Sequence, residues 1–267
     1  PGAIVAFPAP TFPMADVFAR MNDARPVPVR LAPDGSLDDG ALDRLARADL
    51  VYLCRPNNPT GSMIPRERVL ELLDRARGLV LIDEAYGEYA GESMLGPALA
   101  SGRGVVLRTL SKAYGLAGLR IGYGIGPEPL IRAIELSRGP YKVNAPGERA
   151  AAAALAEGWP WVRDIVERTR RNRERLAREL AARGLAVLPG AANFLLAATG
   201  PGGAAALKSA LADRGIGVRA FRELDGVGDA IRVTVGPWPL MERFLGALDA
   251  ALAAAADIAL PEPEAIP

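Results

Sequence analysis

Three side chains that could act in catalysis follow short apolar runs in the first half of the chain: Asn58, Asp83 and Lys112. Runs rich in Val, Ile and Leu are typical of strands buried on both faces of a sheet, and ligands bind beyond the carboxyl ends of such strands. If the strands are parallel and adjacent, the three side chains converge at one edge. Each also has an ordinary explanation, as a turn residue, a helix cap or a surface lysine. Together they favour a catalytic site.

The composition restricts the chemistry of that site. The chain has no histidine and one cysteine, Cys54, which excludes Ser-His-Asp and Cys-His catalysis, histidine-bound metals and cysteine-based zinc clusters. Lys and Arg number 32 against 31 Asp and Glu, so no one-sided basic field points to nucleic acid or a membrane surface. No apolar run reaches the ~20 residues of a membrane span. We therefore expect no metal, nucleic acid or membrane partner, and chemistry carried by Lys, Asp, Glu, Tyr, Arg or a cofactor.

Asn58, Asp83 and Lys112 each lie in a short sequence motif, and the three motifs together resemble those of a known family. Residues 55–61 read RPNNPTG, residues 82–86 read IDEAY, and residues 109–122 read TLSKAYGLAGLRIG. In order and spacing they resemble the fold-type I, pyridoxal-phosphate-dependent aminotransferases of class I and II, most closely the histidinol-phosphate aminotransferase branch. The resemblance runs from about Phe7 to about Leu248. It implies a cytoplasmic homodimer that transfers an amino group between an amino acid such as glutamate and an oxo acceptor.

The resemblance assigns the catalytic residues and those around the cofactor ring. Lys112 is expected to hold the cofactor aldehyde as a Schiff base and then to move a proton, which requires a neutral amine. Asp83 is expected to keep the pyridine nitrogen protonated by pairing with it. Tyr86, the third catalytic candidate, and Asn58 match the family's donors to the ring hydroxyl. Phe12 matches the aromatic side chain that stacks on the ring.

The resemblance also assigns the groups that bind the cofactor phosphate and the substrate. Arg120 can bind the phosphate with two parallel hydrogen bonds, with Ser111 and Thr109 beside it. The expected substrate contacts are Arg232 for the α-carboxylate, Arg219 for the distal end, and Asn193, Tyr141 and Asn144. Arg232 alternates with apolar neighbours, so it should point away from the core of its sheet.

The apolar runs also predict the fold. In the first half, strands are expected at residues 3–7, 27–31, 50–54, 79–82, 105–107 and 121–125, with helices at 13–22, 36–47 and 65–77 between them. Such alternation indicates a doubly wound, mainly parallel α/β domain, the cofactor-binding large domain, over residues 1–143. Residues 144–267 are expected to form a smaller α+β domain, with strands at 186–188, 194–197, 216–218 and 230–235 and helices at 148–157, 159–183, 202–214 and 239–255. The tail 260–267 is proline-rich.

Other interpretations remain open. A threonine-phosphate decarboxylase or an aromatic aminotransferase would share the same cofactor-binding frame. An inactive module of this fold, used for binding or regulation, is disfavoured because the candidate cofactor residues are all present. The family normally begins upstream of Pro1 with a Gly-rich helix start that binds the cofactor phosphate and a tyrosine that enters the partner's site. We therefore expect that the N-terminal part of the large domain is missing from this sequence.

Overall fold

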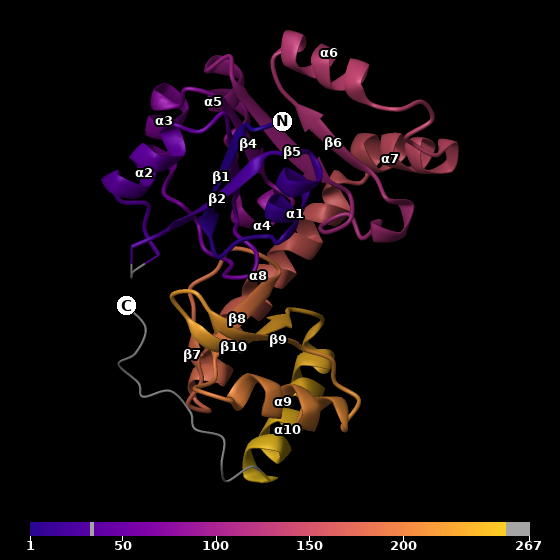
Figure 1. The fold of residues 1–267 in the computed structure, drawn as a ribbon. Helices are drawn as coiled ribbons and strands as arrows, with labels where there is room; N and C mark the ends of the chain where they lie inside the picture. The colour runs from indigo at the N-terminus through magenta and orange to yellow at the C-terminus, as the bar shows by residue number, and fades with distance from the viewer. Residues whose placement is uncertain (33–34, 255–267) are drawn as a thin grey trace.

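The computed structural model describes residues 1–32 and 35–254 (Figure 1). A six-stranded sheet forms the first part, in the order β2-β1-β3-β4-β5-β6. Its strands are β1 (Ile4–Ala9), β2 (Arg25–Arg30), β3 (Leu50–Cys54), β4 (Leu79–Asp83), β5 (Gly104–Thr109) and β6 (Gly122–Ile125). The first five are parallel and β6 runs antiparallel to β5, which confirms the predicted mainly parallel sheet.

Helices cover both faces of this sheet, as expected for a doubly wound fold. The helices of this part are α1 (Met14–Met21), α2 (Asp39–Ala46), α3 (Arg66–Arg75), α4 (Gly87–Ala90), α5 (Leu95–Ala100) and α6 (Glu128–Ser137), of which α6 has no buried residue. On one face Leu45 of α2 and Leu72 of α3 are buried against the strands. On the other face Ala19 of α1 packs with Tyr52 and Cys54 of β3. The strand order reverses at β1, because β2 lies on one side of it and β3 on the other. Open α/β sheets bind ligands at such a switch point.

A four-stranded antiparallel sheet forms the second part, in the order β7-β8-β10-β9. Its strands are β7 (Ala186–Val187), β8 (Phe194–Ala198), β9 (Arg219–Leu224) and β10 (Gly228–Thr234), and it packs with α9 (Gly203–Ala212) and α10 (Trp238–Ala254). Ile231 and Val233 of β10 are buried in this core, so the expected inward alternation of the strand is confirmed. The second part is the predicted smaller α+β unit.

Two helices, α7 (Ala145–Glu157) and α8 (Trp159–Ala181), join the parts. Ala151 of α7 packs with the first part. Val162 of α8 packs beside Tyr86 of the first part, whereas Leu180 of the same helix is buried in the second core. The predicted domain boundary between residues 143 and 144 stays a prediction. Because the two ends of α8 pack in different cores, a boundary within α8 should be tested as well.

One predicted strand is wrong. Residues 216–218 are not a strand, and the chain instead forms β9 from Arg219 to Leu224. The sequence RAFREL places charged residues on an exposed edge strand, where burial does not demand an apolar run. The short helices α4 and α5, and helix α6, were not predicted. The proline-rich tail lies outside the described residues.

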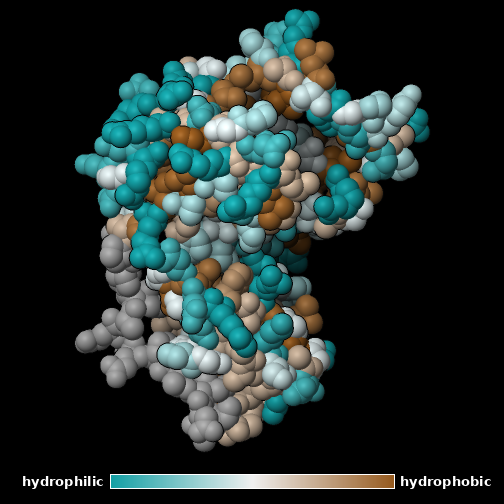
Figure 2. Space-filling view, in the orientation of Figure 1, coloured by the Kyte–Doolittle hydropathy of each residue, from teal (hydrophilic) through white to brown (hydrophobic). Residues whose placement is uncertain are grey.

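The surface is mixed in character. Figure 2 shows hydrophilic side chains over much of the visible face, with hydrophobic side chains gathered over α6. Leu136 of α6 is 83 % exposed, and Ile134 of the same helix is also exposed. Trp159 and Trp161, at the start of α8, are also exposed.

Candidate active site

The carboxyl ends of β1, β3, β4 and β5 lie at one edge of the parallel sheet. Phe12 follows β1, Asn58 follows β3, Asp83 ends β4 and Lys112 follows β5. The strands are adjacent, so the predicted convergence of Asn58, Asp83 and Lys112 is what the topology produces. Phe12 is 38 % exposed at this edge. The site therefore lies at the switch point of the sheet.

Asp83 is held by two donors, one on each carboxylate oxygen. The Tyr52 hydroxyl donates to Oδ2 at 2.6 Å, and the backbone N–H of Ala85 donates to Oδ1 at 2.9 Å. A carboxylate has about four lone-pair positions, so it can still accept a bond from a third group. Asp83 is therefore oriented without being fully occupied.

Lys112 lies beside Tyr86, with its Nζ 5.2 Å from the centre of the ring. The residue is solvent-accessible as a whole, and the protein partly desolvates its amine. Burial lowers the pKa of Lys112, and the positive charges of Arg232 and Arg120 lower it further, against the opposing effect of Asp83. A neutral amine is therefore present at lower pH than for an ordinary lysine, which suits a nucleophile and proton carrier.

Tyr86 lies where the first and second parts of the chain are in contact. Its buried ring meets Phe194 of β8 edge to face, with centroids 5.1 Å apart. Burial raises the pKa of the Tyr86 hydroxyl to about 12, with Arg232 opposing and Cys54 and Asp83 adding to the rise. Tyr86 is thus a neutral hydrogen-bond donor at ordinary pH.

Arg232 reaches from the second part to the first. Its Nη1 donates to Oδ1 of Asn58 at 2.5 Å, and its guanidinium carbon lies 4.8 Å from the centre of the Phe194 ring. Burial lowers its pKa, Tyr86 opposes this, and Arg219 adds to it. Arg219 is paired directly with Arg232 across β9 and β10, so both side chains share one face of the sheet. Arg232 therefore contacts the turn at residues 55–61 (the Asn58 turn), and Arg219 is its cationic neighbour on the same face of the sheet.

The loop that carries Lys112 is closed by Thr109 and ends at Arg120. The Thr109 hydroxyl donates to the carbonyl of Ile121 at 3.2 Å and accepts from the N–H of Ser111 at 3.1 Å. Arg120 is exposed, has a left-handed backbone with φ of 60°, and donates to the carbonyl of Ala117 at 3.1 Å. Thr109 thus shapes the loop, and Arg120 presents a guanidinium close enough to affect Lys112.

The structure describes no contact between the other predicted substrate residues, Asn193, Tyr141 and Asn144, and the side chains of Lys112 or Asp83. The side chain of Asn193 bonds the hydroxyl of Tyr89, whose pKa burial nevertheless raises to about 12. Tyr141 is fully exposed. Asn144 caps α7, since its Oδ1 accepts from the N–H of Gly147 at 2.7 Å. The substrate roles of Asn193, Tyr141 and Asn144 stay predictions.

Sequence reasoning missed a buried ion cluster behind the site. Arg108 of β5 binds Glu84 at 2.6 Å and Glu88 at 3.2 Å. One oxygen of Glu88, Oε2, is buried without a hydrogen-bond partner among the described residues. Burial raises the pKa of Glu88, against the opposing effect of Arg108. The three residues follow the predicted strands at 79–82 and 105–107 and lie outside them, so no local pattern pointed to their burial.

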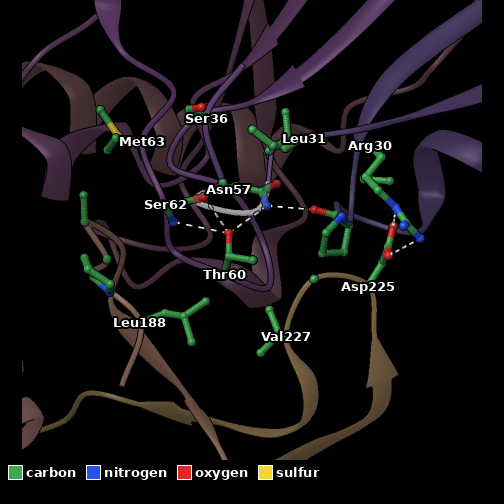
Figure 3. A pocket seen from close by; sticks show the side chains of 18 of the residues that line it. Arg30, Leu31, Ser36, Asn57, Thr60, Ser62, Met63, Leu188, Asp225 and Val227 are labelled. Carbon is green, nitrogen blue, oxygen red and sulfur yellow. Dashed lines mark hydrogen bonds and ion pairs between the residues drawn. The ribbon is translucent and has the colours of Figure 1, made fainter. Parts of the chain in front are cut away.

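A pocket of about 790 Å³ lies next to the Asn58 turn (Figure 3). Asn57, Thr60 and Ser62 line it from the first part, and Leu188 and Val227 line it from the second. The ion pair between Arg30 and Asp225, at 2.7 Å, joins the two parts at its rim. Its described lining does not include Lys112 or Asp83, so the strand ends, and not this pocket, define the candidate catalytic site.

Within residues 1–32 and 35–254, no group of three His, Cys, Asp or Glu side chains is placed to bind a metal ion. In the same residues no helix has the length and apolar character needed to span a bilayer. The groups gathered at this edge are instead the amine of Lys112, the carboxylate of Asp83, the phenol of Tyr86 and the amide of Asn58, together with the guanidinium of Arg232 from β10. That donor set fits pyridoxal phosphate, which needs an amine for its aldehyde, an anion for its ring nitrogen and a cation for its phosphate.

Comparison with known proteins agrees with this donor set. The model of the family "Aminotransferase class I and II" matches residues 1–248. Histidinol-phosphate aminotransferase of Thermoanaerobacter pseudethanolicus is 37 % identical over 238 residues, which cover 88 % of this chain and 67 % of that protein. Histidinol-phosphate aminotransferase 2 of Carboxydothermus hydrogenoformans is 40 % identical over 262 residues, which cover 93 % of this chain and 70 % of the relative.

A solved structure shows the same fold. Histidinol-phosphate aminotransferase from Sinorhizobium meliloti, in complex with pyridoxal-5'-phosphate, superposes with a TM-score of 0.84 and 31 % identity, over 96 % of this chain and 72 % of the other. The family model spans nearly the whole chain, and the relatives agree with it in sequence and in fold. The chain therefore belongs to the class I and II aminotransferases, which makes it a transaminase that works with pyridoxal phosphate.

Proposed function

We propose that this transaminase acts on a phosphorylated amine and carries out the histidinol-phosphate aminotransferase reaction, with an amino acid such as glutamate as the other substrate. The observation that carries the proposal is the direct pairing of Arg232 with Arg219 beside the Asn58 turn. Two adjacent cations suit a phosphate, which carries more negative charge and more acceptor oxygens than a single carboxylate. The similarity to relatives named as histidinol-phosphate aminotransferases supports the same substrate.

In this proposal the residues at the strand ends hold the cofactor. Bound pyridoxal phosphate supplies an aldehyde that can link to an amine and a ring that withdraws electrons. Lys112 provides that amine and then carries a proton at Nζ. Asp83 faces the pyridine nitrogen and keeps its proton in place. Tyr86 and Asn58 donate to the ring hydroxyl.

The cofactor phosphate and ring face are assigned to other residues of the same edge. Arg120 binds the phosphate, together with the hydroxyls of Ser111 and Thr109. Phe12 covers one face of the ring from the end of β1. These assignments follow the strand order, which places β1 and β5 on either side of β3 and β4.

The substrate side is assigned to the second part of the chain. Arg232 exchanges its bond to Asn58 for the α-carboxylate of an amino acid, and Arg219 binds a distal phosphate. Asn193 directly precedes β8 and is kept as a further contact. Tyr141 and Asn144 are kept as contacts from the segment before α7.

We also propose that the protein is a homodimer and that it is cytoplasmic, as the family resemblance implies. Apolar side chains exposed on α6 and at the start of α8 support an interface between two copies. Sedimentation equilibrium tests the dimer, because a monomer at micromolar concentration would contradict it.

The experiment that tests the proposed function combines the purified protein with pyridoxal phosphate, glutamate and the oxo form of histidinol phosphate. We expect visible absorption from cofactor bound to Lys112, followed by the formation of 2-oxoglutarate and histidinol phosphate. Transfer to an aromatic oxo acid in place of the phosphorylated one would favour an aromatic aminotransferase. Release of carbon dioxide from threonine phosphate would favour a decarboxylase. Binding without any turnover would favour an inactive module.

A further inference from the structure

Tyr52 lies on β3 and faces the carboxylate that ends the neighbouring strand. The register pairs Tyr52 with Leu81 and Cys54 with Asp83. Residues two apart on a strand share a face, so Tyr52, Cys54 and Asp83 are all on the face covered by α1. The Tyr52 hydroxyl lies 2.6 Å from Oδ2 of Asp83.

The surroundings of Tyr52 do not otherwise call for a hydroxyl. The side chain is only 7 % exposed and packs among Val5, Phe7 and Ala19. A phenylalanine would fill this space equally well, and a buried hydroxyl without a partner is costly. The hydroxyl donates to Asp83 at 2.6 Å, and the Cys54 thiol is its other polar neighbour. The polar atom is therefore explained by the carboxylate and not by packing.

The hydroxyl remains a donor over the whole working range of pH. Burial raises the pKa of Tyr52 far above its usual value, and the charges of Cys54 and Asp83 raise it further. Because the proton stays on the oxygen, Asp83 always receives this bond. With the Ala85 N–H on the other oxygen, both carboxylate oxygens have a fixed partner and the plane of the carboxylate cannot turn freely.

We propose that Tyr52 is a positioning residue of the active site, whose hydroxyl holds the Asp83 carboxylate in the orientation that meets the pyridine nitrogen of the cofactor. The inference rests on the role of Asp83 in the proposed function. Tyr52 does not touch the cofactor, and it acts through Asp83.

The first test uses the protein without cofactor, so that it does not depend on the proposed function. Tyr52→Phe, Asp83→Ala and the double variant are compared in a denaturant-unfolding cycle. A hydrogen bond to a charged group predicts a coupling of about 10- to 100-fold in the unfolding equilibrium constant. Additive effects would show that the bond contributes nothing and would overturn the proposal.

The second test uses the holoenzyme with cofactor labelled with ¹⁵N at the pyridine nitrogen. Tyr52→Phe should shift the ¹⁵N resonance and lower kcat by about tenfold, the effect of one lost hydrogen bond, with little change in KM. The matched control is Tyr123→Phe, which removes a half-buried hydroxyl from β6 of the same sheet and leaves both bonds to Asp83 in place. An unshifted resonance and an unchanged kcat in Tyr52→Phe would overturn the positioning role.

The two tests separate this inference from the function on which it rests. If the wild-type protein shows no absorption from cofactor bound to Lys112, the proposed function fails and the positioning role fails with it. The unfolding cycle still measures the bond in that case. If the wild type is active and Tyr52→Phe matches it in every readout, only the inference about Tyr52 fails.

Discussion

Arg232→Ala removes the cation proposed to bind the substrate carboxylate, and its effect can be worked from the structure. A desolvated charge pair that loses one partner costs about 2–5 kcal/mol. In the free protein the guanidinium already binds Asn58 at 2.5 Å, so a substrate gains only part of that energy when it replaces Asn58. We therefore expect a loss of about 2–3 kcal/mol, or about 30- to 150-fold in kcat/KM, for glutamate.

Arg219→Ala is the matched variant on the neighbouring strand. Arg219 is exposed, so solvent screens its interactions more than those of Arg232. We expect Arg219→Ala to lower kcat/KM for histidinol phosphate several-fold and to leave kcat/KM for glutamate nearly unchanged.

Arg232 also acts on Lys112 through its charge. Burial is the main cause of the lowered pKa of Lys112, and Arg232 is the next. Removing this charge raises the pKa, so attachment of pyridoxal phosphate, which needs the neutral amine, should begin at higher pH in Arg232→Ala than in the wild type. Stopped-flow absorbance over a series of pH values, with the wild type and Arg232→Ala compared at each, measures this shift.

Steady-state rates with both substrates complete the assay, with thermal unfolding as the check that each variant is folded. A loss of less than about threefold for glutamate in Arg232→Ala would refute the carboxylate assignment. Equal losses for both substrates in Arg219→Ala would refute the phosphate role and remove the main structural support for histidinol phosphate.

Three further variants test the core of the site. Lys112→Ala should abolish both the visible absorption of the bound cofactor and transamination, and a fully active variant would contradict its role. Asp83→Asn keeps the shape and removes the charge, so the rate should fall by orders of magnitude while equilibrium dialysis still finds the cofactor bound; an unchanged rate would mean that another group holds the ring proton. Arg108→Leu leaves the carboxylates of Glu84 and Glu88 buried without their cation, and urea unfolding should show a loss of about 3–5 kcal/mol; wild-type stability would show that the cluster is dispensable.

The strand-end residues could be predicted because their signals are local. Asn58 and Lys112 lie in short words with a definite turn or loop chemistry, and the apolar runs before them indicate buried strands. The orientation of Arg232 followed from alternation along a single strand. Each of these predictions needed only neighbours within a few residues.

The features that were missed depend on pairing between distant segments. Tyr52 and Asp83 are 31 positions apart, and only the register of two parallel strands brings them together. The edge strand β9 was misplaced because an exposed edge carries no apolar run. The helix cap at Asn144 did have a local signal, an Asn ahead of a Pro in the first helical turn.

Helix α8 connects the two parts of the chain rigidly, so a tilt of the helix would move one part relative to the other. One continuous helix of 23 residues is anchored at its start beside Tyr86 and at its end in the second core. At 1.5 Å per residue it is about 35 Å long, so a tilt of about 5° at the anchored start would carry its far end about 3 Å. Since Ile231 and Val233 of β10 lie in the same core as that far end, a small rocking of α8 would move the strand that carries Arg232 relative to Lys112 without unfolding either sheet.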